Sequence, residues 1–219
     1  MDSLGKLHHH GKKIWHFLWN DTSLWSLLAN IIVAFLLIRF IVYPLLGVSL
    51  GTSYPIVAVI SESMEHGLHN GMICDHQLEN FQESFDNYWD TCGAWYTEKN
   101  ISKEQFSQFP FRDGFNTGDV IILWQAKKEN LHIGDVLVFQ GSKPQPIIHR
   151  IVRIWQEEGI TYYQTKGDHN GDSIPGSSGE KRIDQSRLLG KGIVRIPYLG
   201  WVKIIFVDAV KPFGITIKK

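Results

Sequence analysis

Two serines one residue apart follow an apolar run near the start of the chain, and their types and spacing raise the question of a nucleophile. The run Pro55–Ile60 ends on Ser61, and Ser63 follows directly before Met64. A strand that runs into a polar turn explains this pattern without any chemistry. A serine hydroxyl becomes a nucleophile at neutral pH only when a base lies within hydrogen-bond distance. The hypothesis of a nucleophile therefore depends on whether the rest of the chain supplies that base.

His149 and Asp168 are the candidates for the base and for the acid that orients it. His149 lies in a run predicted to be a strand, residues 146–154, on the apolar face of the alternation. A lone histidine on such a face is more often a core residue bonded to the backbone. Asp168 follows a glycine but, unlike two other Gly-Asp pairs in the chain, leads into no strand. With Ser63 these side chains have the types of a Ser-His-Asp triad, which geometry rather than chain order must establish.

Two groups of potential metal ligands do not match established metal-site patterns. Asp168, Asn170 and Asp172 have the early spacing of a calcium loop. The loop then has Ser173 where glycine is required and Gly179 where glutamate is required. A second group matches no zinc spacing and consists of His66, His69, Cys74 and His76. We therefore expect neither a metal nor a cofactor.

The most apolar segment of the chain, Leu24–Leu46, contains Arg39 as its only charged residue. As a helix it would be about 35 Å long, which is enough to span a bilayer. The alternatives are a buried core helix and the apolar part of a removed signal peptide. Its length weakens the first alternative, and the absence of a small-x-small cleavage site directly after it weakens the second. We expect a retained transmembrane helix.

The charges that flank this helix predict its orientation. Between Arg39 and Lys99 there is no lysine or arginine, whereas three lysines precede the helix: Lys6, Lys12 and Lys13. Because cytoplasmic flanks carry the excess of positive charge, we expect a cytoplasmic and interfacial segment at 1–23, the helix at 24–46 and an extracytoplasmic domain at 50–219. The membrane is then the cell membrane or one of the endoplasmic-reticulum type.

The chain after the helix is typical of a mainly β domain. Short runs rich in β-branched residues and bounded by turn residues occur at 54–60, 119–124, 135–139, 146–154, 159–166 and 190–196. Many short strands of this kind favour a small barrel or sandwich. A stretch near the C-terminus, residues 198–210, is too short to span a bilayer and is either a core element or an apolar face against lipid.

One acidic block interrupts the β pattern. Residues 75–113 hold eight Asp and Glu against three Lys and Arg, with a helix-like piece at 101–109. We interpret this block as an insertion at about 72–117, either a solvated excursion, which is the default, or a surface for a partner. The sequence leaves open whether Cys74 and Cys92 form a disulfide. The formal net charge of zero gives no electrostatic reason to expect a nucleic-acid partner.

Four blocks of the chain, in order, resemble the motifs of type I signal peptidases of the archaeal and endoplasmic-reticulum kind. "SESMEHG" resembles the motif in which the serine before methionine is the nucleophile, here Ser63. "GDVIILW" resembles the strand that follows it. "IIHRIVRI" resembles the block in which this subgroup carries a histidine base, here His149, where bacterial relatives carry lysine. "TKGDHNGD" resembles the block that supplies the acid, here Asp168. Lys166 is the alternative base.

The resemblance implies a membrane-anchored serine endopeptidase that removes N-terminal signal peptides from secreted and membrane pre-proteins after small residues. Its partners would be the signal peptides of exported pre-proteins, the lipid bilayer and the secretion channel. Ser63 would be the nucleophile, His149 the general base and Asp168 the orienting acid. The Ser63 backbone N–H and the Ser61 hydroxyl would form the oxyanion hole, in a β domain that binds the peptide as an added strand.

The sequence departs from the family pattern at the second acid. The family often has another aspartate six positions after the first, and Ile174 stands at that position. Asp172 is the nearest substitute. A different class of function is a non-catalytic, membrane-anchored β-barrel subunit of a processing or secretion complex, which would hold partners through the acidic insertion. The presence of Ser63, His149 and Asp168 together favours the enzyme.

Overall fold

The computed structural model describes residues 12–13 and 15–201. The chain divides into two compact units, one that ends at Ser49 and one that begins at Leu50. The apolar C-terminal stretch at 198–210 therefore lies mostly outside the described residues, and so does Lys6.

The N-terminal unit contains one long apolar helix, built from α2 (Leu24–Leu37), a π-helical turn η1 (Ile38–Val42) and α3 (Tyr43–Leu50). Among the described residues it is the one helix long and apolar enough to cross a bilayer. Its large apolar side chains are exposed. Pro44 is the second residue after the π-helical turn. A wider turn accommodates a proline, which has no N–H and whose ring clashes with the preceding turn of an α-helix. The helix continues four residues beyond the predicted end at Leu46.

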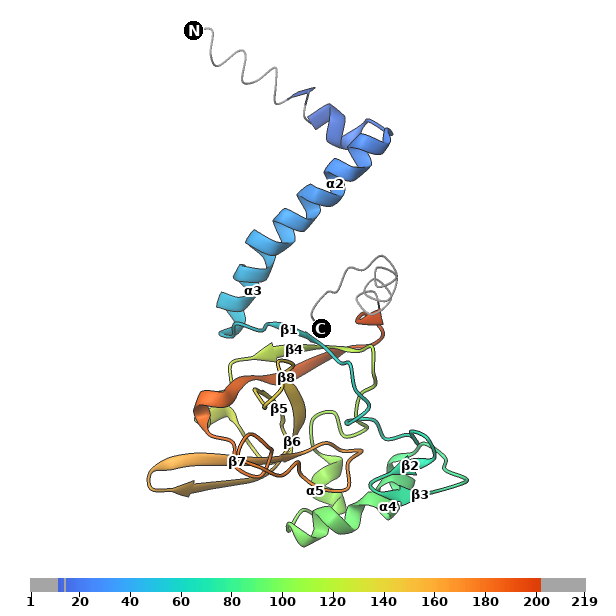
Figure 1. The fold of residues 1–219 in the computed structure, drawn as a ribbon, viewed down its shortest axis with the longest axis vertical. Coiled ribbons are helices and arrows are strands. Elements are labelled where there is room, and N and C mark those ends of the chain that lie inside the picture. Colours follow the sequence, from blue (N-terminus) through green and yellow to red (C-terminus); the bar gives the residue numbers. More distant parts are fainter. Residues whose placement is uncertain (1–11, 14, 202–219) are drawn as a thin grey trace. The chain divides into compact units, whose positions relative to one another are not determined.

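The second unit is built on one six-stranded antiparallel sheet with the strand order β1-β4-β8-β5-β6-β7 (Figure 1). The bounds of its strands are β1 Ile56–Ala58, β4 Val120–Trp124, β5 Val136–Phe139, β6 Ile147–Glu157, β7 Ile160–Lys166 and β8 Leu188–Ile196. The prediction of a mainly β domain is confirmed. The sheet is open, with β1 and β7 at its edges, rather than closed into the expected barrel or doubled into a sandwich.

The central strand β5 is buried on both faces, and this divides the core into two clusters. Val136 and Val138 point into a cluster with Met64 and residues of β4. Leu137 and Phe139 point into another cluster with residues of β6 and β7. His149 on β6 lies directly opposite Leu137 in the register, so it pairs with a strand whose residues are all buried.

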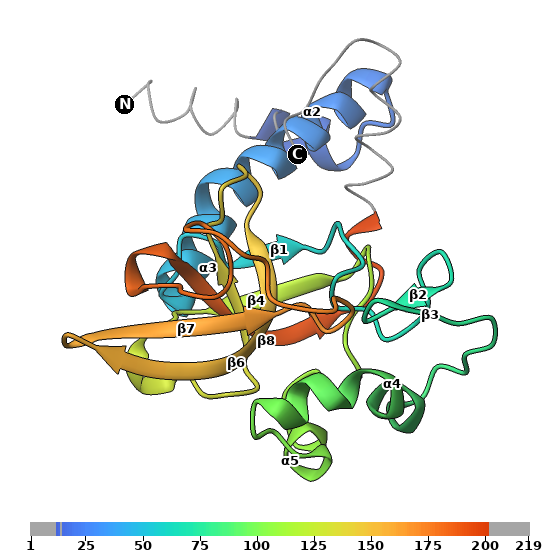
Figure 2. The same ribbon diagram turned by 60° about the horizontal axis from the view of Figure 1, so that its bottom comes forward.

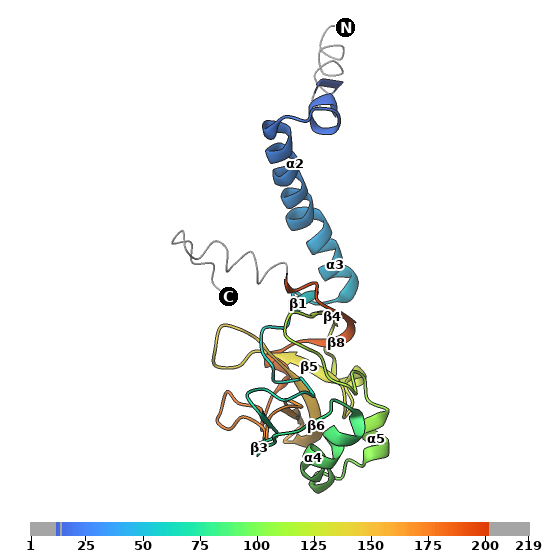
Figure 3. The same cartoon turned by 90° about the vertical axis from the view of Figure 1, so that its right-hand side faces the viewer.

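The insertion is a packed element and not merely a solvated excursion. It contains β2 (Met72–Ile73), β3 (His76–Gln77), α4 (Phe85–Glu98) and α5 (Lys103–Ser107). A capping box at Ser102 begins α5, as the helix-like pattern predicted. Figures 2 and 3 show α4 and α5 beside β6, and their buried side chains form one cluster with Val152 of that strand. Cys74 and Cys92 form a disulfide that ties α4 to the segment before it.

Candidate active site

The nucleophile candidate lies on a loop that the core holds at both ends. Before it, the Val59 N–H donates to the Asp119 carbonyl at 2.8 Å. After it, Met64 is completely buried, and its carbonyl accepts from the Phe115 N–H at 3.1 Å. The apolar residues on each side therefore stay in the core while the loop between them leaves Ser63 partly exposed.

The structure brings Ser63 and His149 together. The Ser63 Oγ lies 2.8 Å from the His149 Nε2, on an imidazole that is 3% exposed. The Ser61 hydroxyl lies 3.2 Å from the Ser63 hydroxyl and is exposed to solvent. A serine hydroxyl can give its proton to Nε2 only if that nitrogen is unprotonated, which requires the ring proton to be on Nδ1. The group that faces Nδ1 therefore decides whether this pair can react.

That group is Glu180. Its Oε1 accepts a short hydrogen bond from the His149 Nδ1 and another from the Thr165 hydroxyl at 2.8 Å. Its Oε2 accepts from the Ile174 backbone N–H at 2.8 Å. Because all three donors hold a carboxylate that is 0% exposed, Glu180 has one fixed position against the imidazole. A carboxylate at Nδ1 favours the tautomer that leaves Nε2 free to accept the serine proton.

The expected contact between Asp168 and the imidazole is corrected by the structure. The Asp168 carboxylate instead forms an ion pair with Arg150, with 2.6 Å between Nη2 and Oδ2. It also accepts from the Tyr96 hydroxyl at 3.1 Å and contacts the His66 Nε2 at 3.0 Å. The physical reason is burial: the Arg150 guanidinium is completely buried, and a buried charge requires a counter-ion. Asp168 supplies that charge, while Glu180 takes the place beside His149.

Electrostatics at Asp168 fit this structural role. Burial by itself would raise the pKa of the carboxyl group, but the Arg150 guanidinium and the hydrogen bond from His66 outweigh burial and lower it. Burial, followed by the Asp168 charge, raises the pKa of Tyr88 and of Tyr96 well above the ordinary value. Both phenols therefore stay protonated and can donate hydrogen bonds.

Ser63 and His149 line a groove of about 730 Å³. One wall is formed by the edge strand β1 and the residues after it up to Ser63, and another by the start of β6. The loop 174–179, which Glu180 anchors at its end, forms a third part of the lining. An edge strand beside a groove is a surface on which an extended peptide can pair as an added strand.

Comparison with known proteins finds relatives that are named as signal peptidase subunits. No family model matches the chain. The signal peptidase complex catalytic subunits SEC11C of Canis lupus familiaris and of Homo sapiens are each 28% identical to it over 98 residues, which is 43% of this chain and 51% of theirs. The subunit SEC11 of Verticillium alfalfae is 30% identical over 95 residues, 42% of this chain and 55% of its own. The chain is therefore similar to signal peptidases of the endoplasmic-reticulum type. It spans about half the length of the curated relatives it matches.

The second acid was the main departure from the signal peptidase pattern, and sequence reasoning missed Glu180. Asp172, the expected substitute, is half exposed and bonds to Lys181 at 2.9 Å and to the Trp95 Nε1 at 3.1 Å. Glu180 is the next carboxylate along the same loop. The absence of the aspartate at Ile174 was therefore a usable indication that the acid lies further on.

Two of the potential metal ligands have other partners. His66 contacts Asp168, and Cys74 is in the disulfide. Among the residues that the structure describes, no three His, Cys, Asp or Glu side chains converge as a metal site.

Lys166, the alternative base, is turned away from the nucleophile. Its Nζ donates to the carbonyl groups of Gly167 and Asp168, at 3.1 and 3.3 Å, and lies over the rings of Trp95 and Tyr96. Burial lowers the pKa of this lysine to about 8. The lowered pKa is therefore explained by its packing in the insertion and not by contact with Ser63.

The buried lysine predicts a pH dependence of stability. Because the pKa of Lys166 is lowered in the folded state, burying its charge costs stability below about pH 8. That cost is relieved as the pH rises from about 8 towards the unfolded pKa of about 10.4. Relative to Lys166→Met, the free energy of unfolding of the wild type should therefore rise by roughly 3 kcal/mol over this range.

The measurement is denaturant unfolding of both proteins in detergent between about pH 7 and pH 10.5. Lys181→Met is the matched control, because it removes an exposed lysine and should keep the wild-type pH dependence. Parallel pH profiles for the wild type and Lys166→Met would contradict the prediction.

Proposed function

We propose that this chain is a membrane-anchored serine endopeptidase that removes N-terminal signal peptides from secreted and membrane pre-proteins after small residues. The observation that carries the proposal is the contact between Ser63 and His149, with Glu180 on the other ring nitrogen, at a groove beside a sheet edge. A serine, an imidazole and a carboxylate in this order are the parts that acyl transfer requires.

In the proposed reaction Ser63 attacks the carbonyl carbon of the scissile bond while His149 takes the hydroxyl proton. The Ser63 N–H and the Ser61 hydroxyl donate to the oxyanion that forms. His149 then gives the proton to the leaving amine, which leaves an ester on Ser63. Water, deprotonated by the same imidazole, hydrolyses this ester and releases the signal peptide. Glu180 holds the ring and stabilises the imidazolium in both steps.

The groove supports binding of the substrate in an extended form. β1 is at the edge of the sheet, so its outer backbone groups can pair with a peptide that lies along the groove towards Ser63. Backbone pairing is indifferent to side-chain identity, so the preference for small residues must come from how closely the peptide packs against the lining. Ile174 and Ile60 are half-exposed apolar side chains that border this space.

We further propose that the helix Leu24–Leu50 anchors the chain in a membrane, with the N-terminus in the cytoplasm and the catalytic unit outside. Lys12 and Lys13 precede the helix and agree with the positive-inside rule. The disulfide Cys74–Cys92 supports an oxidising, extracytoplasmic compartment for the second unit. Ser63 follows the last residue of the helix by 13 positions, so the chain can place it no more than about 45 Å from the helix end.

The proposed topology predicts which segment an external protease reaches. Trypsin added to right-side-out vesicles should cut after exposed basic residues of the insertion, such as Lys99, and leave Lys12 and Lys13 intact. Mass spectrometry of the released peptides gives the cut sites. Vesicles opened with detergent are the control and should show cuts on both sides. Cutting at the N-terminal lysines alone in sealed vesicles would overturn the topology.

The catalytic proposal is tested by incubating the purified full-length chain in detergent with a secretory pre-protein. We expect one cut, mapped by mass spectrometry of the new N-terminus, after a small residue at the end of the signal peptide. We further propose the lipid bilayer and the secretion channel as partners of this chain. A chain that binds the pre-protein but leaves it uncut would favour a non-catalytic subunit instead.

A further inference from the structure

Four residues, Lys166 to His169, form a turn that holds the nucleophile loop, and we call it the 166–169 turn. The His169 N–H donates to the Ser63 carbonyl at 3.0 Å, and the Asp168 N–H contacts the Met64 sulfur at 3.4 Å. Gly167 packs so closely that a Cβ there would lie 2.6 Å from the Ser63 carbonyl oxygen and 2.8 Å from the His149 Nε2. The position of Ser63 therefore depends on the position of this turn.

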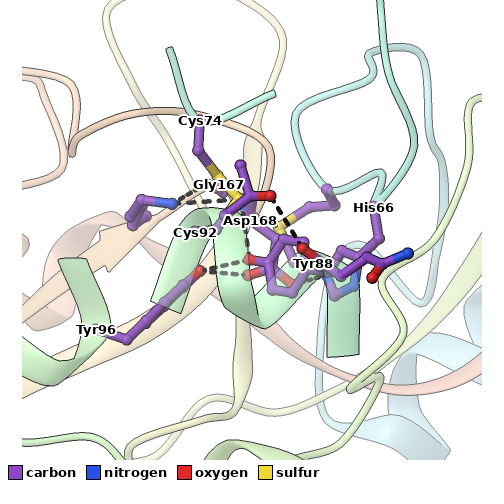
Figure 4. The surroundings of a disulfide bond; sticks show 11 residues. His66, Cys74, Tyr88, Cys92, Tyr96, Gly167 and Asp168 are labelled. Atoms are coloured by element: carbon purple, nitrogen blue, oxygen red, sulfur yellow. Dashed lines mark hydrogen bonds and ion pairs between the residues drawn. A yellow bond between two sulfur atoms is a disulfide. The ribbon is translucent and has the colours of Figure 1, made fainter. Parts of the chain in front are cut away.

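The insertion holds the same turn from its other side. The Tyr88 hydroxyl donates to the Asp168 carbonyl at 3.0 Å, and the Tyr96 hydroxyl donates to the Asp168 carboxylate at 3.1 Å. Figure 4 shows both phenols and the disulfide gathered around Asp168. The rings of Trp95 and Tyr96 also cover the Lys166 ammonium group. Residues of α4 thus contact the backbone of the turn at Asp168 and the side chains of Asp168 and Lys166.

The disulfide adds a covalent link to this arrangement. The Cys74 N–H donates to the His169 carbonyl at 2.8 Å, and the Cys74 sulfur contacts the Asp168 carbonyl at 3.3 Å. Cys74 is bonded to Cys92, which is in the middle of α4. A continuous series of contacts therefore leads from α4 through Cys74 and His169 to the Ser63 backbone.

We propose that the insertion is a positioning element for the nucleophile, in which Tyr96 and the Cys74–Cys92 disulfide fix Ser63 through the 166–169 turn. The proposal rests on the proposed function of Ser63 and adds residues that touch no substrate. Ser63 lies on a loop rather than in a strand, so its attack geometry depends on neighbours that limit the motion of that loop. A misplacement of about 1 Å can cost roughly 100-fold in rate.

Positioning can be separated from the general stability of the insertion, because α4 has another face. Ala94 is exposed on that helix and lies between the residues that contact the turn. Ala94→Gly weakens the helix without removing a contact to Asp168 or His169. Tyr96→Phe keeps the ring in the cluster and removes the hydroxyl group that bonds to the Asp168 carboxylate and to the Tyr88 hydroxyl. The double variant Cys74→Ser/Cys92→Ser removes the covalent link without leaving a free thiol.

The kinetic test compares these variants in the full-length protein, at a temperature where thermal melts show all of them folded. We expect kcat for pre-protein cleavage to fall on the order of 10-fold in Tyr96→Phe and in the double serine variant, with KM changed less than about 2-fold. Ala94→Gly should lower the melting temperature and keep the wild-type kcat. Equal kcat in all variants, or an equal loss in Ala94→Gly, would overturn the proposal.

A second measurement does not depend on cleavage. Amide hydrogen exchange reports the bond from the His169 N–H to the Ser63 carbonyl, and we expect exchange at His169 to be at least about 10-fold faster in the double serine variant than in the wild type. The Ala94→Gly variant should keep the wild-type rate there. Unchanged exchange in the double serine variant would overturn the proposal. If exchange at His169 is faster in the double serine variant as expected, but the wild type cleaves no pre-protein, only the proposed function would be refuted.

Discussion

Replacement of Ser63 by alanine is expected to abolish cleavage of a pre-protein and to leave the protein folded. Without the hydroxyl group no acyl-enzyme can form, and the loss of a serine nucleophile lowers kcat by on the order of 10⁶-fold in a comparable site. The side chain is partly exposed and its hydroxyl bonds to His149, so we expect little change in the thermal melt. The measurement is the single-turnover rate of pre-protein cleavage in detergent, with the melt recorded for each sample.

Ser61→Ala is the matched control for this variant. It removes a hydroxyl group that lies 3.2 Å from the Ser63 Oγ. It should lower kcat by about 10²- to 10³-fold, which is the usual effect of losing one oxyanion donor. The two serines should therefore differ by several orders of magnitude. Wild-type activity in Ser63→Ala would refute its role as the nucleophile.

Glu180→Gln is expected to lower kcat by about 10⁴-fold with little change in KM. An amide in place of the carboxylate can donate to the His149 Nδ1, which moves the ring proton to Nε2. The Ser63 hydroxyl then faces a nitrogen that cannot accept its proton. The shape of Glu180 is preserved. The Ile174 N–H can still donate to the amide oxygen, and the Thr165 hydroxyl can turn to accept from the amide nitrogen, so folding should be kept. Single-turnover rates measure the loss of cleavage, and thermal melts measure whether folding is kept.

Substitutions at Asp168 and Asp172 test whether either aspartate, rather than Glu180, orients His149. Asp168→Asn removes the counter-ion of the buried Arg150 and should cost about 3–5 kcal/mol of stability, seen in the melt. Asp172→Asn, on a half-exposed side chain bonded to Lys181, should keep nearly the full rate. If Asp168→Asn were inactive with an unchanged melt while Glu180→Gln cleaved normally, the two acids would have to exchange roles.

The strands were predictable because runs of β-branched residues bounded by turn residues specify them locally. The pairing of Ser63 with His149 was predictable from the resemblance of their motifs to those of a known family, since the residue types alone left His149 open as a core residue. The end of the long helix was misplaced by four residues because Pro44 does not stop a helix that can widen its turn.

The acid was not predictable in the same way, because its position depends on packing between distant segments. Strand alternation turns Arg150 to the opposite face from His149, towards the insertion, and only the folded insertion shows that this arginine is completely buried. That burial requires Asp168 as a counter-ion. A loop then has to bring a second carboxylate back to His149, and the bridge between Tyr163 and Ile183 returns the chain to place Glu180 there. Loop length in the sequence does not reveal this return.

The insertion was underestimated for a related reason. Its acidic composition favoured a solvated excursion, whereas the buried positions of α4 are occupied by Tyr88, Cys92 and Tyr96. Phenols are buried when their hydroxyl groups find partners. Those partners are on Asp168, far away in the sequence, so the burial of α4 becomes evident only from the tertiary structure.

The most direct test of an activated Ser63 is its reaction with a fluorophosphonate probe, followed by mass spectrometry of the modified peptide. A phosphonate reacts only with a serine whose proton can be taken by a nearby base, so the test needs no knowledge of the natural substrate. We predict one adduct, on Ser63, with a labelling rate that falls on the order of 10³-fold or more in His149→Ala and in Glu180→Gln. A folded wild-type protein that is not labelled at Ser63, or is labelled equally fast without His149, would contradict the proposed Ser63–His149–Glu180 site.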